Sequence, residues 1–100
     1  MSNPDLIKQF LTLYQTQLPI DFNALKEAVI DGNYTNIANK AHHIKPTMVY
    51  IGANEQQNKL QNIEVLAKLK NTPEINRLFK ELEQDFNLLL EEMSLYVRHL

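Results

Sequence analysis

Two histidines followed by a lysine are the residues of this chain best suited to chemistry. They occur in the run Ala41-His42-His43-Ile44-Lys45. A neutral imidazole is a competent nucleophile near pH 7, because its unperturbed pKa is about 6.5. A lysine three residues further along a helix lies close to the ring and can offset negative charge there. The pattern therefore suits contact with a phosphate-bearing partner, provided that the ring faces solvent.

A helical wheel places both histidines outside the apolar stripe of their segment. That stripe comprises Tyr34, Ile37, Ala41, Ile44, Met48 and Ile51. Each histidine lies about 130° from the centre of the stripe, so both rings are expected to face water. Ala38 and Val49 share the helix face of His42, and Lys45 adds one positive charge. Mainly polar side chains surround His43, so the neighbours favour His42 as the reactive residue.

The elements that position these residues are helical by their periodicity. We expect a first helix from Pro4 that Pro19 interrupts, because proline removes a backbone bond and crowds the preceding turn. A short second helix follows from Asp21 and ends at Asp31-Gly32-Asn33. A third helix runs from about residue 34 towards Ile51. The histidine pair therefore falls near the middle of the third helix.

Two further helices complete the predicted fold. Asn54 with Gln57 resembles a capping box for the fourth helix. Thr72, followed by proline, is the expected cap of a long final helix whose apolar residues repeat at three-and-four spacing almost to the terminus. We predict a single all-α domain over residues 1–100, an antiparallel four-helix bundle with an additional short helix near the N-terminus.

Composition excludes several classes of protein. The 100 residues are 44% hydrophobic and 22% charged with a net charge of −2, which is typical of a globular domain and gives no nucleic-acid footprint. No apolar run approaches the roughly 18 residues of a membrane span. The absence of cysteine excludes disulfides and thiolate metal sites. Two glycines are too few for a phosphate-binding glycine loop. We expect a cytoplasmic protein with neither nucleic acid nor membrane as a partner.

The sequence resembles the histidine-containing phosphotransfer (HPt) domains. Their signature is Ala-His-x-Leu-Lys-Gly, followed by Gly-Ala, and its counterparts here are Ala41-His42-His43-Ile44-Lys45-Pro46 and Gly52-Ala53. Supporting matches in the same register are Asp31-Gly32-Asn33-Tyr34 and Ile63-Glu64. The resemblance covers nearly the whole chain and implies a helical bundle that carries phosphoryl groups between other proteins.

The resemblance also implies the roles of individual residues. His42 would be the phosphoacceptor and Lys45 would stabilise the charge of the phosphate. Ala38, Pro46 and Val49 would form the partner-binding surface. The partner would be a response-regulator receiver domain, a hybrid histidine kinase, or both. The chain itself would bind no cofactor and have no autonomous catalytic site, because Mg²⁺ would come from the receiver.

Pro46 departs from the family pattern, which commonly has glycine there. Proline cannot donate a backbone bond to the carbonyl of His42, at a cost of about 3 kcal/mol in a helix interior. We expect a bend just past His42. The alternative function is a non-catalytic helical interaction module that binds a receiver or kinase without phosphotransfer. Exposed Val49 and Tyr50 would suit that function equally well.

Other candidate sites are weaker. His43 is expected to be a solvated surface residue, and His99 suits the negative end of the final helix dipole. A zinc site from His42 and His43 is disfavoured, because adjacent helical residues diverge by about 100°. The acidic pair Glu91-Glu92 has no predicted cleft around it, so a standalone enzyme is disfavoured.

Overall fold

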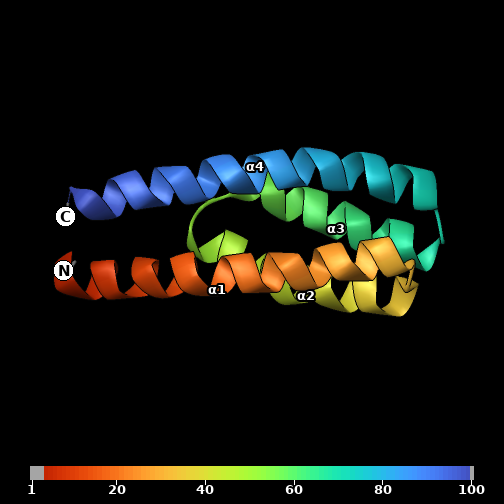
Figure 1. Ribbon diagram of the computed structural model, residues 1–100, viewed down its shortest axis with the longest axis horizontal. Coiled ribbons are helices and arrows are strands. Elements are labelled where there is room, and N and C mark those ends of the chain that lie inside the picture. Colours follow the sequence, from red (N-terminus) through yellow and green to blue (C-terminus); the bar gives the residue numbers. More distant parts are fainter. Residues whose placement is uncertain (1–3, 100) are drawn as a thin grey trace.

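The structure, a computed structural model, describes residues 4–99, which form helices and no strands. The four helices are α1 (Pro4–Asp31), α2 (Tyr34–Tyr50), α3 (Asn54–Lys68) and α4 (Thr72–Arg98). They assemble into one elongated helical bundle, and the two ends of the chain lie at the same end of it (Figure 1). The all-α prediction is confirmed. Among these helices, none combines the length and the apolar character that crossing a membrane requires.

The structure has one helix where the sequence predicted two. α1 continues through Pro19 for 28 residues, so the predicted additional short helix is the second half of α1. Proline in a helix interior costs about 3 kcal/mol. Leu18 and Leu25, on either side of it, are 1% and 0% exposed. Burial of one such side chain contributes about 1.5–3 kcal/mol, so the two together outweigh the lost backbone bond.

Two helix starts differ in detail from their predictions. Asn71 rather than Thr72 caps α4, since the Asn71 side chain accepts a hydrogen bond from the backbone N–H of Glu74. α3 begins at Asn54 with Ala53 in the cap position and no side-chain cap bond. The predicted capping box at Asn54 therefore does not form, although both helices start within a residue of the expected place.

Two glycines lie in the turns that follow α1 and α2. Gly32 and Gly52 have φ values of +67° and +73°, in the left-handed region that other residues adopt only with strain. Gly32 follows α1 and Gly52 follows α2. They allow the chain to turn back sharply, which lays α2 along both α1 and α3.

The core runs through the part of the molecule where all four helices are present. α2 packs on α1 and α3, and α4 packs on the same two helices. The predicted stripe of α2 is confirmed as its core face, with Ile37, Ala41, Ile44 and Met48 buried. Phe22 of α1 stacks on Phe79 of α4 at a ring-centroid distance of 5.1 Å.

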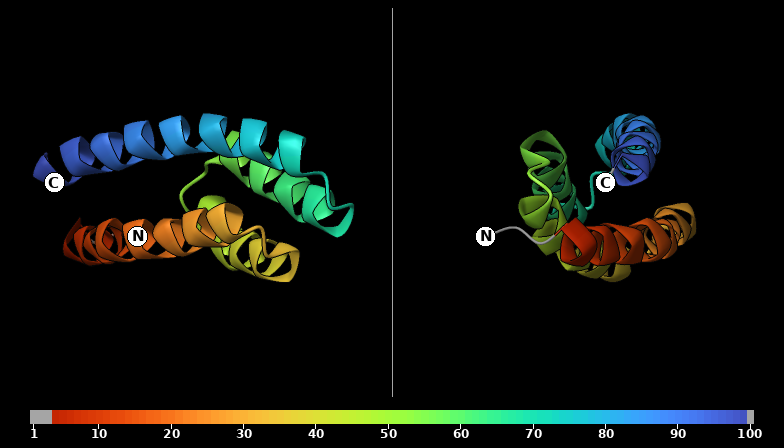
Figure 2. Two further views of the ribbon diagram at one scale, coloured as in Figure 1. Left: turned by 45° about the vertical axis from the view of Figure 1, so that its right-hand side comes forward. Right: turned by 90° about the vertical axis from the view of Figure 1, so that its left-hand side faces the viewer.

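The helices have unequal lengths. α1 and α4 have 28 and 27 residues, whereas α2 and α3 have 17 and 15. The bundle measures 44 × 21 × 19 Å. Four helices are side by side at the end of the α1–α2 and α3–α4 turns, and α1 and α4 alone continue to the end that holds the termini (Figures 1 and 2). The histidine pair lies in the four-helix part.

Candidate functional site

Both histidines of α2 project into solvent. The side chains of His42 and His43 are 73% and 68% exposed. Ala41 and Ile44, on the opposite side of the helix, are fully buried. The core therefore needs neither ring, as the helical wheel predicts.

A buried carboxylate distinguishes the two histidines. Glu64 of α3 is 7% exposed and is the one charged residue found buried in the part of the chain that the structure describes. One of its oxygens lies 2.9 Å from Nδ1 of His42, and the other contacts Nζ of Lys45. Nζ of Lys45 also donates to Oε1 of Gln61 at 2.5 Å. These four residues, two from α2 and two from α3, form a single polar network that we call the Glu64 network.

The Glu64 network determines which nitrogen of His42 is available. An ionised carboxylate only accepts hydrogen bonds, so Nδ1 of His42 carries the proton and its N–H donates the hydrogen bond to Glu64. In the neutral ring the other nitrogen, Nε2, then holds a lone pair. Because the ring is largely exposed, Nε2 is accessible from solvent. Glu64 thus orients the ring and selects the tautomer with a nucleophilic outer nitrogen.

Lys45 provides the cation that the buried carboxylate requires. An ionised carboxylate removed from water is stable when it is paired and hydrogen-bonded. The side chain of Lys45 is 17% exposed and bridges Glu64 and Gln61. The lysine that the sequence nominated as a phosphate stabiliser is therefore close to His42, with its ammonium bound to the carboxylate that holds the ring.

His43 and His99 have different surroundings. Nε2 of His43 lies 3.7 Å from a carboxylate oxygen of Asp21, which is too long for a hydrogen bond. His99 caps the C-terminal end of α4, away from the Glu64 network. Within residues 4–99, no three His, Cys, Asp or Glu side chains are grouped so that they could hold a metal ion.

A shallow pocket of about 350 Å³ adjoins the His42 ring. Its lining consists of His42, Lys45, Pro46, Val49, Tyr50 and Gln57. The structure thus brings four of the five nominated site residues into one pocket. Ala38, the fifth, is half-buried one turn earlier on α2 and does not line it. α2 continues helically through Pro46 as far as Tyr50.

Sequence reasoning missed the contribution of α3. Glu64 appeared there only as part of a family register, and Gln57 and Gln61 were not nominated. A signal for Glu64 was present, because it lies on the buried stripe of α3 that holds Leu60, Ile63 and Ala67. An acidic residue on a core stripe is rarely fully buried without a partner, so its position calls for a nearby cation.

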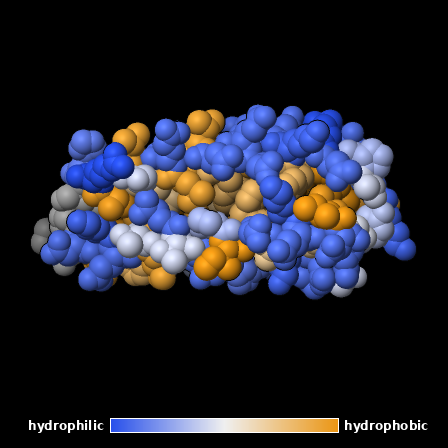
Figure 3. Space-filling model, in the orientation of Figure 1, coloured by the Kyte–Doolittle hydropathy of each residue, from blue (hydrophilic) through white to orange (hydrophobic). Residues whose placement is uncertain are grey.

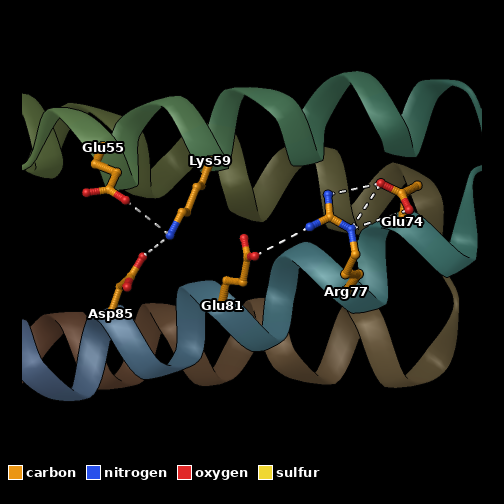
Figure 4. A network of polar contacts seen from close by, with 6 residues as sticks. All are labelled: Glu55, Lys59, Glu74, Arg77, Glu81 and Asp85. Carbon is orange, nitrogen blue, oxygen red and sulfur yellow. Dashed lines mark hydrogen bonds and ion pairs between the residues drawn. The ribbon is translucent and has the colours of Figure 1, made fainter.

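A second set of ion pairs joins α3 to α4 and lies along α4 (Figure 4). It is not part of the candidate site. Nζ of Lys59 lies 2.5 Å from Asp85, and this hydrogen bond raises the pKa of Lys59 above its ordinary value of 10.5. On α4, the guanidinium of Arg77 bonds Glu74, which raises the pKa of Arg77. The Lys59–Asp85 pair is largely removed from solvent, whereas Arg77 and Glu74 are exposed.

No protein-family model matches the sequence, and neither a curated protein nor a solved structure matches the chain.

Proposed function

We propose that this protein is a histidine phosphotransfer protein of a two-component phosphorelay, built as an antiparallel four-helix bundle. It accepts a phosphoryl group on Nε2 of His42 from a receiver-domain aspartate or a histidine kinase, and passes it to another receiver. The observation that carries the proposal is an exposed imidazole whose inner nitrogen is hydrogen-bonded to buried Glu64. The resemblance of the sequence around His42 to HPt domains supports the same function.

The transfer needs little from this chain beyond a positioned nucleophile. The lone pair of Nε2 attacks the phosphorus of an aspartyl phosphate and forms a nitrogen–phosphorus bond. The bond between phosphorus and the acyl oxygen breaks, and the aspartate leaves as a carboxylate. Phosphoryl transfer depends mainly on positioning and on neutralising oxygen charge, for which the receiver supplies Mg²⁺. The reverse reaction with a second receiver returns the ring to its starting state.

Glu64 assists because the imidazole becomes more positive as the new bond forms. Its carboxylate accepts the hydrogen bond from Nδ1 throughout, and this bond strengthens as the ring gains charge. The stabilisation is therefore greater in the transition state than in the resting protein, which is the condition for faster transfer. Glu64 is a positioning residue, since it acts on the phosphate through His42.

Lys45 has two successive roles in this proposal. Before transfer it forms an ion pair with the buried carboxylate of Glu64 beside the ring. After transfer its flexible stem allows the ammonium to offset the charge of the phosphate on His42. Pro46 and Val49, with Ala38 one turn before His42, provide a largely apolar surface on which a receiver can dock.

The experiment uses a donor that does not require the cognate receiver. Phosphoramidate carries its phosphoryl group on nitrogen and can transfer it to an exposed imidazole. We expect the wild-type protein to acquire an acid-labile, base-stable label, and His42→Gln to acquire none. His43→Gln is the matched control, since it alters the neighbouring ring of similar exposure and should keep the label. Labelling that persists in His42→Gln, or disappears in His43→Gln, would contradict the assignment.

Receiver domains then distinguish a carrier from a binding module. Transfer of label from a phosphorylated receiver to His42 supports the phosphorelay function. Tight receiver binding with no transfer from either donor would instead identify a non-catalytic interaction module.

A further inference from the structure

The end of the molecule that holds the termini contains an apolar groove. It lies between the first half of α1 and the last half of α4, and the end of α2 closes its inner end. Its volume is about 700 Å³. Half of its lining residues are aromatic or carry sulfur, namely Phe10, Tyr14, Tyr50, Met93 and Tyr96. Apolar surface is visible along the seam between α1 and α4 in Figure 3. We call this feature the terminal groove.

The terminal groove exists because α1 and α4 are longer than α2 and α3. α1 has 11 residues more than α2, and α4 has 12 more than α3. At 1.5 Å per residue, α1 and α4 project by about 16–18 Å beyond the four-helix part. Two helices cannot enclose their apolar faces, so Phe10 of α1 and Tyr96 of α4 remain 52% and 56% exposed, and Tyr50 at the end of α2 is 77% exposed. Apolar residues gathered in this way, rather than scattered singly, mark an interaction surface.

We infer that a second copy of this chain covers the terminal groove and that the protein forms a symmetric dimer through it. The missing cover is two helices over the projecting length, and a second copy brings two helices of that same length. When the projecting parts of two copies overlap, four helices run side by side across the joint. The four-helix cross-section of each copy then continues through the dimer interface.

The exposed aromatic area supplies about half of what one partner contributes to a standard stable interface. Phe10, Tyr50 and Tyr96 together expose roughly 300–450 Å² of aromatic side chain, given the exposed fractions above and about 150–250 Å² for each residue. One partner of a standard stable interface contributes about 800 Å². The aliphatic walls of the groove, which include Ile7, Leu11 and Leu89, add to the aromatic area. A twofold interface uses this surface twice, once from each copy.

Charge does not oppose this association. The net charge of −2 produces little long-range repulsion between copies. Among the residues that line the groove, Glu92 is the charged one, so the surface to be covered is mostly apolar.

The dimer surface meets the proposed docking surface at one residue. Tyr50 lines both the terminal groove and the pocket beside His42. The inference of a dimer stands independently of phosphotransfer, because it is argued from helix lengths and exposed apolar area alone. A failure of one proposal therefore leaves the other to its own test.

Sedimentation equilibrium of the full chain from micromolar to millimolar concentration tests the inference. The expected mass rises from that of one chain, 11.7 kDa, to twice that value. Phe10→Asp and Tyr96→Asp should each raise the dissociation constant at least about tenfold, because each places a charge in the covered groove. Ile30→Asp is the matched control, since Ile30 is 72% exposed on α1 at the opposite end of the molecule. It should leave the dissociation constant unchanged.

Circular dichroism of each variant shows whether its helices are intact, so that a lost dimer is not mistaken for a lost fold. A wild-type chain that remains monomeric at every concentration would overturn the inference. A dimer that persists in both Phe10→Asp and Tyr96→Asp, or that Ile30→Asp weakens equally, would overturn it as well.

Discussion

Replacing Glu64 with glutamine tests the Glu64 network most selectively. The amide has nearly the shape of the carboxylate, so packing on α3 is retained while the negative charge is removed. His42 then loses its charged acceptor, and Lys45 loses its ion partner but keeps the bond to Gln61. Both stability and reactivity should fall.

The size of each effect follows from these contacts. A hydrogen bond to a charged group contributes about 1.5–3 kcal/mol, and one between neutral groups about 0.5–1.5 kcal/mol. The change at His42 is therefore about 1–1.5 kcal/mol. If the transition state loses that whole difference in stabilisation, phosphorylation slows by about tenfold. The lost contact with Lys45 brings the total loss of stability to about 2 kcal/mol, which lowers the Tm of a domain of this size by about 8–16 °C.

The assay compares Glu64→Gln with Glu55→Gln, the same exchange on the same helix at a residue whose side chain is 76% exposed. Thermal melting by circular dichroism gives the change in Tm, and the initial rate of labelling by phosphoramidate gives the change in reactivity. Glu55→Gln should alter stability by less than about 0.5 kcal/mol and leave the labelling rate unchanged. The reasoning is refuted if Glu64→Gln behaves in the same way as Glu55→Gln.

Three further predictions concern stability. Lys45→Met leaves the buried carboxylate of Glu64 without its cation and should cost about 1–3 kcal/mol in urea denaturation; an unchanged midpoint would contradict the role of Lys45. Because Asp85 raises the pKa of Lys59, the stability from that pair is complete below about pH 10.5 and is lost as pH rises through the raised value. The free energies of unfolding of wild type and Lys59→Met should therefore differ by a constant, roughly 0.2–1 kcal/mol, from neutral pH to about pH 10 and converge above it, whereas a difference that stays constant well above pH 10.5 would refute the assignment. Pro19→Ala restores a backbone donor inside α1 and should stabilise the protein by about 1–3 kcal/mol; a lower Tm would show that the helix depends on the proline.

Local sequence signals predicted the helical class and most helix starts correctly. The stripe from Ile37 to Met48 identified the core face of α2, because its period is a property of the helix itself. The prediction of a break at Pro19 was wrong because it used local signals alone. The local cost of proline was correct in sign, but the burial of Leu18 and Leu25 against other helices outweighs it. Sequence patterns do not report that tertiary contribution.

Only those features of the site that lie within one helix were predictable from the sequence. The spacing of three residues between His42 and Lys45 placed them together on α2 without any knowledge of the fold. Glu64 is 22 residues from His42, and their contact depends on which face and which turn of α3 meets α2. The terminal groove similarly depends on the difference in length between α1 and α2, which the mistaken break in α1 concealed.

The position of the phosphoryl group on the labelled protein tests the central claim most directly. Two-dimensional ¹⁵N and ³¹P NMR of the phosphorylated chain identifies both the residue and the ring nitrogen that carry it. We predict one phosphate on Nε2 of His42 with Nδ1 still protonated towards Glu64. Phosphate on Nδ1 of His42, or on His43 or His99, would contradict the account.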